Sequence, residues 1–409
     1  MKTAVLLLVA AALQLGAQSP DVNYDESRVP KYTLPDVLGG ARDRAGWEKQ
    51  RVRILDLYRR EVFGRSPARP AKLAWEVGSV DPKALGGKAS RKIVTIYFNG
   101  KSAAPRARML MYLPAAAKKP VPLFLGLSFA PIQDVANDPG VPLGPEWIKG
   151  ERQPGQEKTR GTHGEQWQVE KILSHGFGLA VIYYGDIEPD FDGGMKYGVR
   201  PLFFKPGQSE PAADEWGAIS AWAWGLSRAM DYLATDRDVD AGRVAVFGHS
   251  RLGKTAIWAG AQDPRFWLII SNESGEGGAA ISRRDYGERT KDLNTRFPHW
   301  FCLNFRQYNG REDQMPFDSH MLLGLIAPRA LYVASAEGDR WSDPRGEFLG
   351  AYHASRVWQL YGKKGLVSDA MPAVNQPVMG QSVAYHIRTG KHDVTAFDWD
   401  QYIKFAEMQ

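Results

Sequence analysis

GHSRLGK at residues 248–254 follows a short apolar run, VAVF at residues 244–247, and leads directly into a stretch with helical spacing. A buried strand that ends in Gly-x-Ser and turns at once into a helix lifts the serine out as an exposed nucleophile. Gly248 removes the Cβ where such a turn brings two backbone segments close together. An ordinary strand-to-helix turn with a serine N-cap gives the same pattern, so the partners of Ser250 must decide between the two readings.

The rest of the chain alternates short apolar strands with amphipathic helices. Strands are expected at residues 121–128, 179–184, 243–247, 266–270, 330–334 and 383–387, and helices at 46–63, 165–173, 214–233, 251–261 and close to the C-terminus. Residues 92–98 and 107–113 alternate like a hairpin at the sheet edge. This rhythm predicts an α/β fold with a mainly parallel central sheet and helices on both faces, a three-layer sandwich.

Composition narrows the class of protein. The chain has 409 residues, 44% of them apolar, which suits one large core, and its 52 Lys and Arg residues are scattered, so a nucleic-acid-binding stripe is not expected. Residues 1–18 read as an export signal because Lys2 precedes a short apolar run that ends in small residues. We therefore expect residues 19–409 to form a single catalytic domain that is secreted or periplasmic, monomeric and free of a membrane anchor. Cys302 is the only cysteine, so no internal disulfide can form.

A nucleophilic serine needs an imidazole to take its proton and an acid to orient that imidazole. His392 follows the expected strand 383–387, in the last-strand loop where the base of such a sheet lies. His386 falls inside that strand, where a packed or solvated role is expected, and His353 lies in a helical run and is expected to be structural.

Two carboxylates compete to be the acid. Glu273 follows the strand expected at 266–270, and Asp339 follows the strand expected at 330–334. Each could equally be a loop carboxylate that accepts backbone N–H groups. Asp343 is a weaker candidate, because Asp343-Pro344 before a helical pattern is typical of an N-cap. The sequence leaves Glu273 and Asp339 both open, and they could share the task.

Two cationic residues close to Ser250 are candidates for stabilising an oxyanion or binding the substrate. The backbone N–H of Arg251 is placed to bind a developing oxyanion, and its guanidinium could add a second donor. Lys254 lies one helical turn further on the same face, where it could bind a substrate or pair with a buried acid. A second oxyanion N–H is expected from the loop at residues 128–131.

Six stretches together resemble the glucuronoyl esterases, carbohydrate esterase family 15, and most of all its bacterial members. They are GHSRLGK, AGAQDPRF at 259–266, SNESGEGGAA at 271–280, ASAEGDRWSDPRGEF at 334–348, GKHDVTAFDW at 390–399, and WQVEKILSHGFGLAVIYYGDIEPD at 167–190. The resemblance implies an α/β-hydrolase fold that cleaves esters between 4-O-methyl-glucuronic acid of xylan and alcohols of lignin.

The resemblance also implies a role for each matching residue. Ser250 would be the nucleophile, His392 the base and Arg251 the oxyanion helper. Glu273 matches the usual acid of the family, and Asp339 matches an acidic position found in some bacterial members. Three further residues match positions that bind the uronic acid ring: Lys254, Glu288 and Trp341.

This chain departs from related patterns at three places. Leu252 stands where the general hydrolase motif has glycine, and His249 stands where fungal members carry a cysteine. The loop GLSFAP at residues 126–131 differs from the asparagine- and glycine-containing version expected for the family, which leaves the second oxyanion donor open.

The favoured hypothesis is a secreted serine esterase for glucuronate esters, with glucuronoxylan or a lignin–carbohydrate ester as its substrate. No metal or organic cofactor is expected, because the histidines and acids lack a motif such as HExxH. An acetyl xylan esterase or other carboxyl esterase could use the same triad. A catalytically silent glycan-binding protein is the alternative from another class, and intact Ser250 and His392 argue against it.

Overall fold

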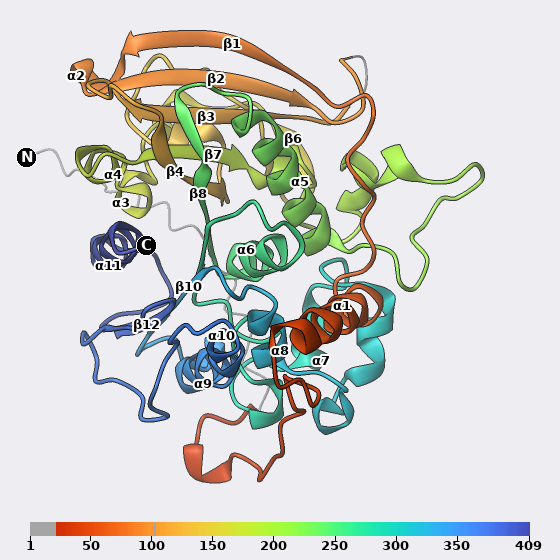
Figure 1. Ribbon diagram of the computed structural model, residues 1–409. Helices are drawn as coiled ribbons and strands as arrows, with labels where there is room; N and C mark the ends of the chain where they lie inside the picture. The colour runs from red at the N-terminus through yellow and green to blue at the C-terminus, as the bar shows by residue number, and fades with distance from the viewer. Residues whose placement is uncertain (1–21, 102–103) are drawn as a thin grey trace, which may run out of the picture.

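The computed structural model describes residues 22–101 and 104–409, and a ten-stranded sheet runs through it (Figure 1). The strand order is β1-β2-β3-β7-β4-β8-β9-β10-β12-β11. Neighbours from β7 to β12 are parallel, whereas β1, β2 and β3 form an antiparallel edge and β11 pairs antiparallel with β12. The strands of this sheet are β1 (Ala74–Lys83), β2 (Ala89–Tyr97), β3 (Arg106–Pro114), β4 (Val121–Ser128), β7 (Gly178–Tyr183), β8 (Val239–His249), β9 (Leu268–Asn272), β10 (Ala330–Ala336), β11 (Val378–Met379) and β12 (Val383–Arg388).

Helices cover both faces of the sheet, as expected from the alternating pattern. Side chains of β8 alternate between two apolar clusters: Val244 and Val246 belong to one, and Ala245 and Phe247 to the other. The first cluster includes α1 (Arg44–Glu61), α5 (Ala218–Leu233), α6 (Arg251–Gln262), α8 (Ser319–Gly324), α9 (Pro344–Ala354) and α10 (Arg356–Gln359). The second includes α4 (Val169–Ser174) and α11 (Ala396–Glu407). The predicted three-layer α/β sandwich is confirmed.

Three expectations about individual elements were wrong. The hairpin of β2 and β3 is not the sheet edge, because β1 pairs outside it. The helix expected at 165–173 is split into α3 (Gly164–Trp167) and α4, because Gln168 takes a positive φ of 43°. The helix expected from residue 214 begins at Ala218 with Gly217 as its N-cap, so Asp214 and Glu215 do not lie in its first turn.

Two long insertions leave the sheet on the side where the strands end. Residues 139–161 include the small hairpin β5 (Glu146–Ile148) and β6 (Glu151–Gln153), and residues 190–211 contain short 3-10 turns. The expected export signal at residues 1–18 lies outside the described residues. Within 22–101 and 104–409, no helix combines the length and apolar character needed to cross a bilayer.

Candidate active site

Four neighbouring parallel strands bring the predicted site residues to one edge of the sheet. Ser250 follows β8, Glu273 follows β9, Asp339 lies just beyond β10 and His392 just beyond β12. These strands are adjacent in the order β8-β9-β10-β12 and run in the same direction, so their carboxyl ends meet. Residues that are up to 142 positions apart in sequence (392 − 250) therefore converge.

Ser250 occupies a strained corner between β8 and α6. Its φ of 58° and ψ of −128° are rare for a residue with a side chain. The corner is held by the Ser250 N–H, which donates to the Asn272 carbonyl at 2.9 Å. A Cβ on Gly248 would overlap the Leu252 carbonyl, so the tight turn requires glycine there. The predicted strand–turn–helix around Ser250 is confirmed.

His392 lies against two carboxylates through a single ring nitrogen. Its Nδ1 is 2.6 Å from Asp339 Oδ2 and 3.1 Å from Glu273 Oε2. Burial alone lowers the pKa of His392, but the hydrogen bonds to Asp339 and Glu273 outweigh it and raise the pKa above its usual value. Since Nδ1 is engaged by the acids, Nε2 is left as the nitrogen that can exchange a proton with a substrate.

The two acids sit in different electrostatic settings. Burial raises the pKa of Glu273, whereas for Asp339 the hydrogen bond from His392 outweighs burial and lowers the pKa. Asp339 is therefore the acid with the stronger tendency to stay ionised, and it also makes the shorter contact. Asp343, the weaker candidate, is the N-cap of α9 as expected: its side chain accepts from Gly346 N–H, and Pro344 follows.

His249 connects the nucleophile corner to the base. Its ring centroid lies 4.4 Å from that of His392, which places His392 beside the residue that precedes Ser250. His249 Nδ1 lies 2.6 Å from Asn272 Oδ1, so Nδ1 donates and Nε2 carries the lone pair. Burial lowers the pKa of His249, so this ring is a neutral packing partner for His392.

Arg251 is held by an acid that sequence reasoning missed. Asp190 accepts from Arg251 Nη1 and also binds His299 Nε2 at 2.8 Å and Trp300 Nε1 at 2.7 Å. Burial would raise the pKa of Asp190, but the Arg251 charge outweighs it and holds the pKa well below its usual range. Nothing in the sequence around Asp190 predicted this contact with Arg251, because only the folded structure brings the insertion at residues 190–211 next to α6.

Lys254, Glu288 and Trp341 form one connected group. Lys254 Nζ donates to Glu288 Oε2 at 2.9 Å and to the Ser274 carbonyl at 2.6 Å, while Trp341 Nε1 donates to Glu288 Oε1 at 3.1 Å. Of the two roles considered for Lys254, the structure shows the pairing with an acid, Glu288, and substrate binding stays a prediction. The structure thus brings together the three residues that, by the resemblance, would bind the uronic acid ring.

Arg388, at the end of β12, binds Glu273, and sequence reasoning also missed it. Its Nη2 donates to Glu273 Oε1 and to the Asp393 carbonyl, each at 2.6 Å, and its Nε donates to Asp398 Oδ2 at 2.8 Å. Asp398 in turn binds His386 Nε2 at 2.9 Å, so His386 is a buried structural residue, as expected. Arg388 therefore fixes Glu273 and the loop that carries His392.

Replacing Arg388 with methionine is expected to lower the free energy of unfolding by about 3–5 kcal/mol, because Glu273 and Asp398 would lose their buried cation. Denaturant unfolding measures this loss. Arg243→Met is the matched control, since Arg243 and Asp240 form an exposed pair whose removal should cost no more than about 1 kcal/mol. Equal losses in the two variants would contradict a structural role for Arg388.

The loop expected to supply the second oxyanion donor turns tightly beside Arg251. Ser128 Oγ accepts from the Ala130 N–H at 3.2 Å, and the Phe129 ring centroid lies 5.4 Å from the Arg251 guanidinium carbon. The structure thus places this loop at the site, and which N–H binds the oxyanion stays a prediction.

A cluster of possible metal ligands coincides with the base and one acid. Among the described residues, ligand atoms of His249, Glu273 and His392 lie within 4.8 Å of one another, close enough to hold an ion. Sequence motifs gave no sign of this grouping, because its members come from three strand ends. Asn272, Arg388 and Asp339 already bind these three side chains.

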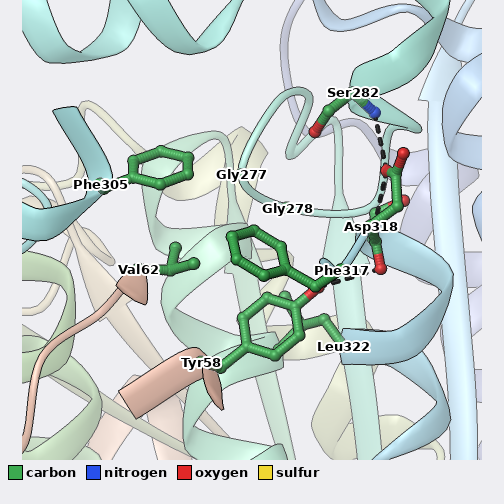
Figure 2. A pocket seen from close by; sticks show the side chains of 10 residues that line it. Tyr58, Val62, Gly277, Gly278, Ser282, Phe305, Phe317, Asp318 and Leu322 are labelled. Atoms are coloured by element: carbon green, nitrogen blue, oxygen red, sulfur yellow. Dashed lines mark hydrogen bonds between the residues drawn. The ribbon is translucent and has the colours of Figure 1, made fainter. Parts of the chain in front are cut away.

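A separate cavity lies between α1, α8 and the loop after Glu276 (Figure 2). Its polar edge is formed by Asp318, which accepts from the Ser282 N–H at 2.8 Å, while Tyr58 donates to the Asp318 carbonyl at 2.9 Å. The cavity contains none of the predicted site residues, so it lies apart from the Ser250 site.

Comparisons with known proteins agree with the geometry. Residues 209–362 match the family model described as glucuronyl esterase of fungi. A carbohydrate esterase from an unknown prokaryotic organism is 44% identical over 99% of this chain and 98% of its own length. A solved glucuronoyl esterase from Solibacter usitatus is 65% identical, with a TM-score of 0.91 over 93% of this chain and 99% of that chain.

A second solved structure extends this agreement. It is described as a promiscuous CE15 esterase from the marine bacterial metagenome and is 45% identical, with a TM-score of 0.88 over 95% of this chain and 99% of that chain. The nearly complete coverage of both chains extends the likeness well beyond the Ser250 corner. With its α/β-hydrolase fold, this chain belongs to the glucuronoyl esterases, carbohydrate esterase family 15.

Proposed function

We propose that this protein is an exported serine esterase that hydrolyses esters of glucuronic acid, including its 4-O-methyl form, through an acyl-enzyme. The observation that carries the proposal is the convergence of four strand ends on one site, with His392 bound to two carboxylates beside the Ser250 corner. Fungal relatives named 4-O-methyl-glucuronoyl methylesterases match part of the chain and support this substrate class.

The chemistry follows from the arrangement of the side chains. His392 Nε2 takes the proton of the Ser250 hydroxyl, and Ser250 Oγ attacks the ester carbonyl carbon. The developing oxyanion is stabilised by the Arg251 N–H at the start of α6 and by the cationic guanidinium. The carbon–alkoxy bond then breaks, and His392 returns the proton to the departing alcohol. Water, deprotonated by the same nitrogen, attacks the acyl carbon. The bond from that carbon to Ser250 Oγ breaks, His392 returns the proton to Ser250, and the free uronic acid leaves.

The group formed by Lys254, which is buried, and the half-buried Glu288 and Trp341 is suited to a uronic acid ring. The ammonium and carboxylate offer charged hydrogen-bond partners to ring hydroxyls, and the indole offers a flat apolar wall. An acetyl ester carries no sugar ring to contact these groups, so it should gain no transition-state binding from them and be hydrolysed more slowly.

Replacing Lys254 with methionine is expected to lower kcat/KM for a methyl glucuronate by about 10- to 100-fold, the effect of losing a hydrogen bond to a charged group. Hydrolysis of an acetyl ester, which does not need this contact, should change much less. Steady-state kinetics on both esters test this, and an equal loss on both would show that Lys254 acts through the fold.

Substrate selectivity tests the proposed function itself. Methyl or benzyl glucuronate should be hydrolysed much faster than the galacturonate epimer and than an acetyl ester. Faster turnover of acetylated xylan with none of the glucuronate ester would instead identify an acetyl xylan esterase or other carboxyl esterase. Binding of glucuronic acid without any hydrolysis would identify a silent glycan-binding protein.

The protein is proposed to act outside the cytoplasm. The export signal expected at residues 1–18 supports a secreted or periplasmic location. We also propose that the exported protein is a monomer. Mass measurement of the protein recovered from the periplasm or medium should show a chain that lacks these residues. A full-length chain retained in the cytoplasm would contradict export.

A further inference from the structure

One buried carboxyl group close to the site takes no part in the mechanism above. Glu347 lies in the first turn of α9, and none of its surface is exposed. Moving a carboxyl from water into the fold costs free energy unless hydrogen bonds compensate for the lost hydration. The groups that Glu347 binds therefore show what it does.

Glu347 joins the ends of two neighbouring strands of the sheet. Its Oε1 accepts from the Ser274 N–H at 2.6 Å and from the Gly275 N–H at 3.0 Å, in the turn that follows β9. Its Oε2 lies 2.7 Å from Ser335 Oγ on β10. The carboxyl thus ties the turn that begins at Glu273 to the adjacent strand.

The turn that Glu347 holds has an unusual backbone. Glu273 has a φ of 47° although it carries a side chain, and Gly275 has a φ of 58°. The Glu273 N–H donates to the Ala334 carbonyl at 2.7 Å, so β10 holds the first peptide of the turn. Glu347 accepts from the next two N–H groups and so fixes the rest of the turn in one conformation.

The same turn also holds Lys254, the cation of the proposed uronic acid site. Lys254 Nζ donates to the Ser274 carbonyl at 2.6 Å. This carbonyl and the Gly275 N–H belong to one peptide unit, which is planar, so the two groups point in opposite directions and turn together. Glu347 on one side of the peptide therefore sets the direction of the carbonyl that holds Lys254 on the other side.

We propose that Glu347 is a positioning residue that orients the Ser274–Gly275 peptide and, through it, Lys254 for the uronic acid ring. The inference rests on the proposed function, in which Lys254 binds that ring. The contact with the substrate belongs to Lys254, and Glu347 acts one step behind it. An acetyl ester does not use Lys254, so its hydrolysis should depend much less on Glu347.

An acceptor oxygen is what this role requires of residue 347, and a negative charge is not needed. Burial raises the pKa of Glu347 to about 8, so the carboxyl is mainly protonated at pH 7. A glutamine keeps one oxygen for the N–H groups of Ser274 and Gly275, and its NH2 group can donate to Ser335 Oγ. Glu347→Gln should therefore behave like wild type, whereas Glu347→Ala removes the acceptor.

The test measures kcat/KM for methyl glucuronate and for 4-nitrophenyl acetate in wild type, Glu347→Ala and Glu347→Gln. Glu347→Ala should lower the glucuronate-to-acetate ratio by about 10-fold, the lower end of the loss expected for Lys254→Met. Glu347→Gln should keep the ratio of wild type. In a Lys254→Met background, Glu347→Ala should leave the ratio unaltered, because the group through which it acts is gone.

Asp138→Ala is the matched control for a general loss of stability. Asp138 is also buried, and it accepts from the Gly140 N–H at 2.9 Å and from the Tyr112 hydroxyl at 2.8 Å. Its partners include Arg91 on β2 and Tyr112 on β3, at the other end of the sheet from β9 and β10. Asp138→Ala should lower the free energy of unfolding and leave the glucuronate-to-acetate ratio unchanged.

The outcomes separate this inference from the proposed function. A ratio that Glu347→Ala leaves unchanged, or that Glu347→Gln or Asp138→Ala lowers as much, would overturn the positioning role. So would an equal fall in the Lys254→Met background. If Glu347→Ala does not fold, Glu347→Asp withdraws the carboxyl from the turn and should lower the ratio in its place. Failure of wild type to hydrolyse methyl glucuronate would overturn the proposed function, and this inference with it.

Discussion

Replacing Ser250 with alanine is expected to lower kcat for glucuronate ester hydrolysis by about four to six orders of magnitude, with little change in substrate binding. The loss is large because no acyl-enzyme can form without the hydroxyl. The fold should tolerate the change, since the Ser250 backbone is held through its N–H and carbonyl by Asn272, Gly253 and Lys254. Steady-state kinetics and binding of glucuronic acid by calorimetry measure the two effects.

Ser271→Ala is the matched control for this prediction. Ser271 lies in β9 near the same edge of the sheet, and its hydroxyl is buried without a hydrogen-bond partner among the described residues. Removing it should leave kcat close to the wild-type value. Turnover by Ser250→Ala within about tenfold of wild type would rule out Ser250 as the nucleophile.

Removing both carboxylates from His392 is expected to cost about as much as removing the base, whereas the single changes should differ. Asp339→Asn should lower kcat more than Glu273→Gln, because Asp339 makes the 2.6 Å contact and its pKa is held low, so it stays ionised. Glu273 makes the 3.1 Å contact, and burial raises its pKa. The expected losses are about 10³-fold for Asp339→Asn and about 10-fold for Glu273→Gln. Both are smaller than the roughly 10⁴-fold loss known for a single triad acid, because the other carboxylate still binds His392 in each variant.

The pH profile shows whether these acids act on His392. The base must be neutral to accept a proton, so kcat/KM falls as pH drops through the pKa of His392. The hydrogen bond to Asp339 raises that pKa, so Asp339→Asn should lower it and move the acid limb of the profile to lower pH. An unchanged acid limb in Asp339→Asn and in the double variant would remove both acids from the mechanism.

The sequence predicted the site best where one strand end was enough to place a residue. Ser250, Glu273, Asp339 and His392 each follow an apolar run, and parallel neighbours bring such ends together. Which acid lies closer to His392 could not be predicted, because that depends on loop geometry beyond the strands. Glu288 and Trp341 were proposed only through the family resemblance, since neither lies at a strand end.

The residues that the sequence missed act through contacts between distant segments. Asp190 reaches Arg251 across 61 positions, and Arg388 reaches Glu273 across 115. No local pattern marks such partners. The break between α3 and α4 was missed for another reason: the apolar spacing continues through Gln168, although its backbone leaves the helical region.

The central claim is that the Ser250 hydroxyl is activated by His392, and covalent labelling tests it most directly. A fluorophosphonate should form one adduct, located by mass spectrometry on the peptide that contains Ser250, with activity lost in proportion. In His392→Ala the labelling rate should fall by orders of magnitude, because the hydroxyl loses its base. Labelling of Ser250 at the same rate without His392, or full turnover by the labelled enzyme, would contradict the mechanism.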